Sequence, residues 1–199
     1  MNAILSGLGK ITRHRLFALP MVAASVTLAA RGIAQERSDL MATTVAQSFT
    51  MIQRSFVNLA DAMPAEKYGF KPTNGEFTGV RTFEQQIKHV ACANFAFFSQ
   101  IENKEPPPKC DTGGPSPAKT KAELMTYLRE SFDYAQKVLR TMTSANALDP
   151  AGGPYGGPST RLGLTTLAVW HASDHYGQLV VYLRLNGIVP PASQPPRSR

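Results

Sequence analysis

Apolar residues recur every three or four positions in four separate stretches of the chain. This spacing places them on one face of an α-helix, whereas a half-buried strand alternates at every second residue. The first stretch contains Val45, Phe49, Ile52, Phe56, Leu59 and Met63, and the second contains Phe83, Ile87, Val90, Ala91, Phe95 and Phe98. The third contains Leu124, Leu128, Phe132, Ala135, Leu139 and Met142. The fourth lies between residues 160 and 187, and no stretch alternates as a strand would, so the pattern predicts an all-α fold.

Capping signals mark the ends of these stretches. Two of them begin with a capping box, Thr82 with Gln85 and Thr120 with Glu123. The fourth stretch ends at Asn186 and Gly187 with Pro190 beyond, which is the pattern of a glycine C-cap followed by a helix-stopping proline. Long connections rich in Pro and Gly separate the helices. The sequence therefore predicts a four-helix bundle, with either crossover or simple up-down connections.

The first 34 residues have the composition of a signal peptide. Three basic residues open the segment, Lys10, Arg13 and Arg15. An uncharged run over residues 16–30 follows, and then the small-x-small motif Gly32-Ile33-Ala34. We expect cleavage before Gln35 and export of the mature chain to the periplasm or out of the cell. A membrane anchor is the alternative, but the run is shorter than the roughly 20 residues of a span and contains Pro20.

The remaining chain is long enough for one domain with a hydrophobic core. The 199 residues are 43% apolar and 18% charged, as in an ordinary globular protein. We expect one bundle domain over residues 35–192, followed by a disordered Pro- and Ser-rich tail over residues 193–199.

The distribution of charge excludes a nucleic-acid partner. The formal net charge is +7, but four basic residues and no acidic residue precede residue 35. The expected mature chain is only weakly basic, and its Lys and Arg residues are mixed with acidic residues. Phosphate binding requires a clustered basic surface instead. We expect no nucleic-acid partner and no stable membrane anchor after cleavage.

Two histidines four residues apart, His171 and His175, are the most informative residues of the chain. On a helix they lie on one face, one turn apart, which is how a helix presents two nitrogen ligands to one metal. His14 falls in the expected signal peptide, so His89, in another apolar helix, becomes the natural third ligand. The hypothesis is a three-histidine site with an open coordination position. The alternatives are a chance pair on an exposed face and a hydrogen-bonded core histidine; we place Trp170 in the core.

Two polar residues beside the pair are candidates for supporting the ligands. Asp174 could accept a hydrogen bond from an imidazole N–H and so fix its tautomer. A surface salt bridge is the interpretation that we favour, because Asp174 lies beside the pair rather than between its members. Gln178, one turn beyond His175, could donate to a metal-bound ligand or be a polar residue at the mouth of the bundle.

The two cysteines, Cys92 and Cys110, allow three interpretations. Cys92 follows His89 by three residues and could approach the metal, since a thiolate is a good zinc ligand. The two could instead form a disulfide in an oxidising compartment, or remain two unpaired thiols. We favour the disulfide, because the chain has the features of an exported protein and carries two cysteines.

A three-histidine site is compatible with two classes of function. In a metal-dependent hydrolase or transferase, the ion would activate water or polarise an oxygen of a small-molecule substrate. In a non-catalytic metal- or ligand-binding bundle, it would be structural or would sense metal availability. The first class lacks an obvious general base, because Asp174 is the only carboxylate near the pair. Catalytic residues are not assigned, and zinc and nickel are the favoured ions among those that imidazoles accept.

Several motifs together resemble the DinB-like (damage-inducible, YfiT-like) family. They lie at residues 59–72, at residues 82–91, in the segment His-Ala-Ser-Asp-His-Tyr-Gly-Gln at 171–178, and at residues 182–191. The resemblance spans about residues 40–192 and is most specific in the last helix and its exit.

This resemblance implies a fold and a site. The fold is an antiparallel four-helix bundle, and the site is a divalent metal held by His89 on the second helix and by His171 and His175 on the fourth. Several characterised relatives are thiol-dependent transferases or isomerases. The resemblance also implies a homodimer, since relatives commonly pair through bundle faces.

Overall fold

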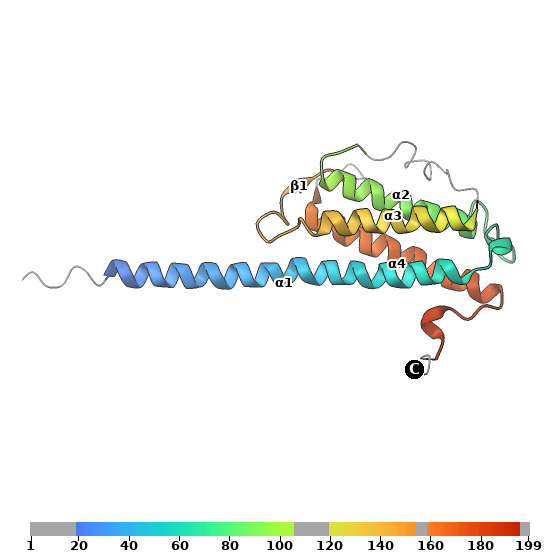
Figure 1. Ribbon diagram of the computed structural model, residues 1–199, viewed down its shortest axis with the longest axis horizontal. Helices are drawn as coiled ribbons and strands as arrows, with labels where there is room; N and C mark the ends of the chain where they lie inside the picture. The colour runs from blue at the N-terminus through green and yellow to red at the C-terminus, as the bar shows by residue number, and fades with distance from the viewer. Residues whose placement is uncertain (1–18, 106–119, 154–158, 196–199) are drawn as a thin grey trace, which may run out of the picture. The chain divides into compact units, whose positions relative to one another are not determined.

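The computed structural model describes residues 19–105, 120–153 and 159–195, with side chains from residue 40 onward. Helix α1 spans Leu19–Ala62, α2 Phe83–Ile101, α3 Lys121–Leu139 and α4 Arg161–Leu185, as Figure 1 shows. Two single 3₁₀ turns follow α1 and α4, at Ala65–Lys67 and Pro191–Ser193. The predicted all-α bundle is confirmed.

One short β-ladder was not predicted. Strand β1, Pro150–Ala151, pairs antiparallel with β2, Ser159–Thr160, immediately before α4. Each strand has only two residues, which is too short for an alternating pattern of apolar and polar residues to be recognised in the sequence. Thr160 then caps α4, because its hydroxyl oxygen accepts from the amide of Gly163 at 3.0 Å.

Contacts divide the chain into two units, Met1–Ser38 and Asp39–Arg199, and α1 runs through the boundary. The first unit includes the helical residues from Leu19 to Ser38. The second unit holds the other three helices and the candidate site. Among the described residues, no helix combines the length and apolarity needed to cross a bilayer.

The predicted helix caps form as the sequence indicated. The Thr82 hydroxyl oxygen accepts from the Gln85 amide at 3.3 Å, and the Gln85 side chain accepts from the Thr82 amide at 2.9 Å. The box of Thr120 with Glu123 is equally complete. These caps fix the first turns of α2 and α3 and therefore the rotation of both helices about their axes.

Helix α2 packs against both α3 and α4, and cross-helix contacts give the directions of all three. Asn94 meets Ser131, and further along both helices Ser99 meets Tyr134, so α2 and α3 run parallel. By contrast, α2 and α4 run antiparallel, as Figure 1 shows. A parallel neighbouring pair modifies the antiparallel arrangement that the family resemblance implied, and it requires a crossover connection between α2 and α3.

The centre of the bundle is a cluster of phenylalanines. Phe49 of α1 lies 5.2 Å from Phe98 of α2 and 5.5 Å from Phe132 of α3, between ring centroids. All three side chains are fully buried. Burial of one such side chain contributes about 1.5–3 kcal/mol, so this cluster fixes how α1, α2 and α3 pack.

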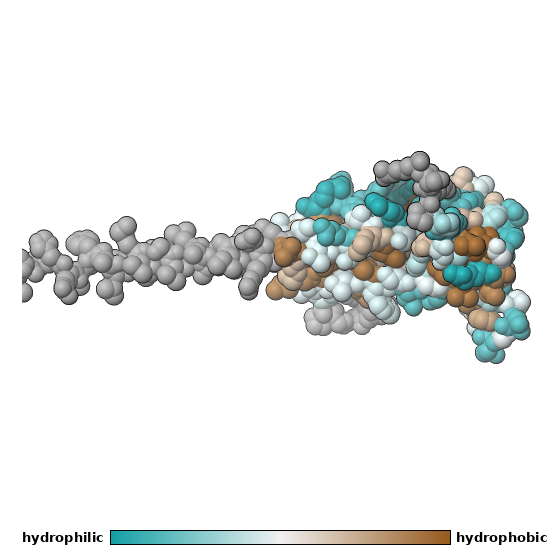
Figure 2. All heavy atoms as spheres, turned by 90° about the horizontal axis from the view of Figure 1, so that it is seen from below, coloured by the Kyte–Doolittle hydropathy of each residue, from teal (hydrophilic) through white to brown (hydrophobic). Residues whose placement is uncertain are grey.

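The expectation that Trp170 is a core residue is wrong, because its side chain is 60% exposed on α4. Val181 and Leu185 on the same helix are also exposed. Helix α4 is apolar on more than one face, so the sequence pattern alone could not select the face that packs inward. In the space-filling view of one face, apolar patches alternate with hydrophilic side chains (Figure 2).

Candidate metal centre

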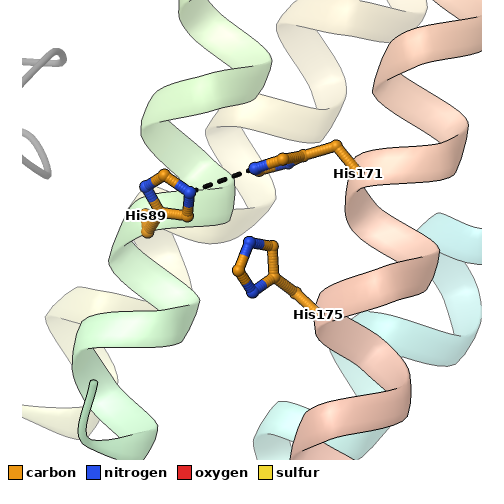
Figure 3. Close-up of side chains that lie close together, drawn as sticks. All are labelled: His89, His171 and His175. Carbon is orange, nitrogen blue, oxygen red and sulfur yellow. Dashed lines mark hydrogen bonds between the residues drawn. The ribbon is translucent and has the colours of Figure 1, made fainter. Parts of the chain in front are cut away.

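Three histidines converge between α2 and α4. His89 comes from α2, and His171 and His175 come from consecutive turns of α4, as Figure 3 shows. Each offers one ligand atom, and these three atoms all lie within 4.8 Å of one another. The antiparallel packing of α2 on α4 thus unites residues that lie far apart in the sequence, as the three-histidine hypothesis required.

The histidines are neutral at physiological pH. Burial lowers the pKa of His89 to about 4, with smaller contributions from the charges of Arg81 and His175. Burial also lowers the pKa of His171 to about 3, helped by the two other histidines and Arg81. The pKa of His175 is lowered mainly by burial, and the nearby Asp174 opposes that shift. Neutral imidazoles carry the lone pair that a metal ion needs.

The spacing of the nitrogens fits a bound metal. The Nε2 atoms of His89 and His171 lie 3.1 Å apart. Two nitrogens of one tetrahedral zinc site, each about 2.0–2.1 Å from the ion, lie about 3.3 Å apart. The buried Nδ1 of His171 has no hydrogen-bond partner among the described residues, and an unpartnered buried polar atom is uncommon in native proteins. The donor set and its spacing therefore suit a divalent ion.

Gln86 contacts the third histidine and was missed by the sequence analysis. The Nδ1 atom of His175 is hydrogen-bonded to the side-chain oxygen of Gln86. Gln86 lies one turn before His89 on α2 and is only 2% exposed. A polar residue three positions before a ligand, and therefore on the same face of the helix, was the available signal. It could be interpreted only once the packing of α2 on α4 was known.

Gln178 and Asp174 continue the contacts of Gln86 toward the surface. The amide nitrogen of Gln86 donates to the side-chain oxygen of Gln178 at 2.7 Å. The amide nitrogen of Gln178 in turn donates to a carboxylate oxygen of Asp174 at 2.8 Å. Asp174 is therefore connected to His175 by hydrogen bonds through the side-chain amides of Gln178 and Gln86. The group that donates a hydrogen bond to Asp174 is Gln178, not an imidazole.

An aromatic ring and a tethered loop border the histidines. The ring of Phe97 packs edge-on against His171, with centroids 5.6 Å apart. The hydroxyl of Tyr182, on α4, donates to the backbone oxygen of Arg81 at 2.9 Å. This contact holds the segment before α2 against α4. The charge of Arg81, in that segment, lowers the pKa of each of the three histidines.

Cys92 stands apart from the histidine group. Cys92 is fully buried on α2 and does not belong to the group of close ligand atoms found among the described residues. Cys110 lies outside the described residues, as does His14. The disulfide between Cys92 and Cys110 stays a prediction.

The chemistry of the group follows from its donors. Three neutral nitrogens provide no negative charge, so a bound divalent ion would retain its double positive charge at the site. The group contains no carboxylate among the described residues. The arrangement can therefore hold a metal ion, and it leaves coordination positions for water or another ligand.

Comparisons with known proteins agree with this fold. The family model described as the DinB superfamily matches residues 48–179. A DinB-like protein from Bacillus cereus superposes with a TM-score of 0.60 at 18% identity, covering 74% of this chain and 93% of its own. A DinB-like protein from Bacillus subtilis gives 0.56 at 19% identity, covering 72% and 92%. No curated protein matches significantly. From its family-model match, the chain belongs to the DinB superfamily.

Proposed function

We propose that the chain binds one divalent metal ion, zinc or nickel, through His89, His171 and His175. The observation that carries this proposal is the convergence of three ligand atoms from α2 and α4 within 4.8 Å. Burial of the imidazoles keeps them neutral, so the ion does not have to displace a proton from a charged ring. Both zinc and nickel accept imidazole ligands.

Calorimetric titration of metal-free protein tests this proposal, using protein purified without a nickel column. We expect one site per chain for zinc or nickel. Replacing any one of the three histidines by Ala removes one of the three ligands, and we expect the affinity to fall by orders of magnitude. The His14→Ala variant of the full chain is the matched control, and its affinity should be unchanged. Native affinity in His89→Ala would refute the three-histidine site.

We further propose that the protein is a metal-dependent hydrolase or transferase that acts on a small molecule. A divalent ion at this site would supply a Lewis acid that activates water or polarises a substrate oxygen. The chain's own residues would shape its surroundings. Phe97 covers one side of His171, and Gln86 holds the ring of His175.

A non-catalytic metal-binding bundle is the alternative, and one observation favours it. The carboxylate connected to the site, Asp174, is exposed and separated from His175 by two amides, so it is poorly placed as a general base. Assays of the zinc-loaded protein with ester, phosphoester and thiol-transfer substrates distinguish the two. Rates above those of His89→Ala would support the enzyme, whereas equal rates across the panel would support the non-catalytic bundle.

We also propose that the protein is exported and forms a homodimer. The support for export is the basic segment, the apolar run and Gly32-Ile33-Ala34. The support for a dimer is membership of a family whose members commonly pair, together with the exposed Trp170, Val181 and Leu185 on α4. A second copy would cover such apolar side chains.

A further inference from the structure

Four side chains form one continuous row from the surface to the candidate metal centre. The row begins at Asp174, passes through Gln178 and Gln86, and ends at His175. Asp174 and Gln178 are exposed, whereas Gln86 and His175 are 2% and 7% exposed. Consecutive members are hydrogen-bonded, and the row crosses from α4 to α2 and back to α4.

The carboxylate at one end determines the direction of every hydrogen bond in the row. An ionised carboxylate can only accept, so Gln178 must turn its NH₂ group toward Asp174. Its oxygen then faces Gln86 and accepts from the NH₂ group there. The oxygen of Gln86 consequently faces Nδ1 of His175, and that nitrogen must carry the hydrogen. If the side-chain amide of Gln178 or Gln86 were flipped, two acceptors or two donors would face each other and a hydrogen bond would be lost.

We propose that Asp174, Gln178 and Gln86 act as a relay of positioning residues that sets the tautomer of His175. With its hydrogen held on Nδ1, the lone pair of His175 lies on Nε2, the nitrogen left free for the metal. A neutral imidazole has two tautomers, and the hydrogen bond made by one nitrogen decides which is present. The proposal rests on the proposed metal-binding function. It means that the exposed carboxylate of Asp174 determines the tautomer of the buried ligand His175.

The relay predicts effects that a merely structural role would not produce. In metal-free protein labelled with ¹⁵N, the imidazole resonances of His175 should report hydrogen on Nδ1 at pH 7.5. Gln86→Leu removes the acceptor, and Asp174→Asn removes the group that fixes the direction of the row. Both should shift His175 toward a mixture of tautomers. The matched control is Asp133→Asn, an exposed carboxylate on α3, which should leave the tautomer unchanged.

Zinc affinity provides a second, independent readout. Loss of such an outer partner typically weakens metal binding about 10–100-fold, which we expect for Gln86→Leu, with a smaller loss for Asp174→Asn. Gln86→Glu moves the carboxylate to the buried end, where it still accepts from Nδ1. The NH₂ group of Gln178 must then face the new carboxylate at position 86. The oxygen of Gln178 consequently faces the carboxylate of Asp174, and two acceptors meet. In this background, Asp174→Asn should therefore no longer weaken zinc binding, because an asparagine side chain can donate to that oxygen.

The outcomes separate the relay from metal binding itself. An unchanged His175 tautomer in Asp174→Asn and Gln86→Leu would overturn the relay, even if the unaltered chain binds zinc. Failure of the unaltered chain to bind zinc would overturn the metal function, while the tautomer measurement in metal-free protein would still decide the relay. Should Gln86→Leu not fold, the exposed substitution Asp174→Asn carries the test. An equal zinc-affinity loss from Asp174→Asn in both backgrounds would also contradict the relay.

Discussion

The Nε2 atoms of His89 and His171 lie 3.1 Å apart, although 82 positions separate the two residues in the chain. A contact this close between two ring nitrogens requires one to donate and the other to accept. The accepting ring must then be neutral, which agrees with the lowered pKa values of His89, about 4, and His171, about 3. A proton added to the accepting nitrogen would remove the lone pair that this contact uses.

The metal-free protein should lose stability as the pH falls from about 6.5 toward 4. Histidines in the unfolded chain take up protons near pH 6.5, whereas the pKa values of His89 and His171 in the folded chain are about 4 and 3. The unfolded state therefore binds more protons in this window. The slope is at most about 1.4 kcal/mol per pH unit for each protected imidazole, and smaller for the half-buried His89, which water screens.

Urea unfolding at pH 7.5, 6.5 and 5.5 measures this loss, and these values stay above the range in which most carboxylates titrate. The variant with all three histidines replaced by Ala should have a flatter pH profile. Identical slopes in the two proteins would show that the histidines are not held neutral by the fold. Metal binding to the folded chain should weaken only as the pH approaches the folded-state pKa values of about 4 and 3, because protons and the ion then compete for the same lone pairs.

Lys121 should stabilise the bundle by capping the end of α1. Its ammonium donates to the backbone oxygens of Asp61 at 2.6 Å and Met63 at 2.9 Å, and it lies near the Tyr68 ring. Lys121→Met keeps the apolar stem and removes the donor. We expect a loss of about 1–2 kcal/mol in the free energy of unfolding by urea denaturation.

The control for this substitution is Lys71→Met, which changes an exposed lysine in the segment between α1 and α2. A surface change of this kind should stay within about 0.5 kcal/mol. Equal effects of the two substitutions would mean that the contacts of Lys121 contribute nothing to stability.

Export should remove the N-terminal segment. Mass spectrometry of the protein secreted by its native host should find a chain beginning at Gln35 or within a few residues. The physical basis is the basic, apolar and small-residue order of the segment. A mature protein that retains Met1 would contradict the prediction.

Cys92 and Cys110 should be joined in protein isolated from an oxidising compartment. Thiol counting under denaturing, non-reducing conditions should find no free thiol, and reduction should lower the free energy of unfolding by roughly 3 kcal/mol in the chain-entropy model. Cys92→Ser should produce a similar loss that reduction does not increase. Two free thiols in freshly exported protein would refute the pairing.

The homodimer is testable by light scattering of the mature protein at micromolar concentration. We expect a mass of two chains. Trp170→Glu, on the exposed side of α4, should shift the equilibrium toward one chain, because it places a charge where an apolar contact would form. The exposed Asn58→Glu on α1 is the control and should leave the mass unchanged. A single-chain mass for the unaltered protein would contradict the prediction.

Local signals made much of the fold predictable. The capping boxes at Thr82 and Thr120 need only residues three positions apart, and the structure contains both. The spacing of His171 and His175 likewise placed both rings on one face of α4. Interactions within one or two helical turns depend on helix geometry alone, so the sequence determines them without knowledge of the tertiary structure.

Features that depend on which helices meet were harder to predict. His89 was predicted as a ligand because few histidines remained and because it lies in another apolar helical stretch, and the family resemblance implied the same ligand. Gln86 was not predicted, because its hydrogen bond to His175 exists only where α2 and α4 pack together. Trp170 was misplaced because α4 is apolar on several faces, so its periodicity did not select one orientation.

Helix α2 carries the phenylalanine cluster and the candidate metal centre on different strips of its surface. Phe98 packs into the bundle centre with α1, while His89 and Gln86 meet α4. Substitutions on the second strip do not open a cavity in the first. Over evolution, the ligands and their hydrogen-bond partners could diversify while the bundle kept its stability, and one scaffold could thereby acquire new chemistries.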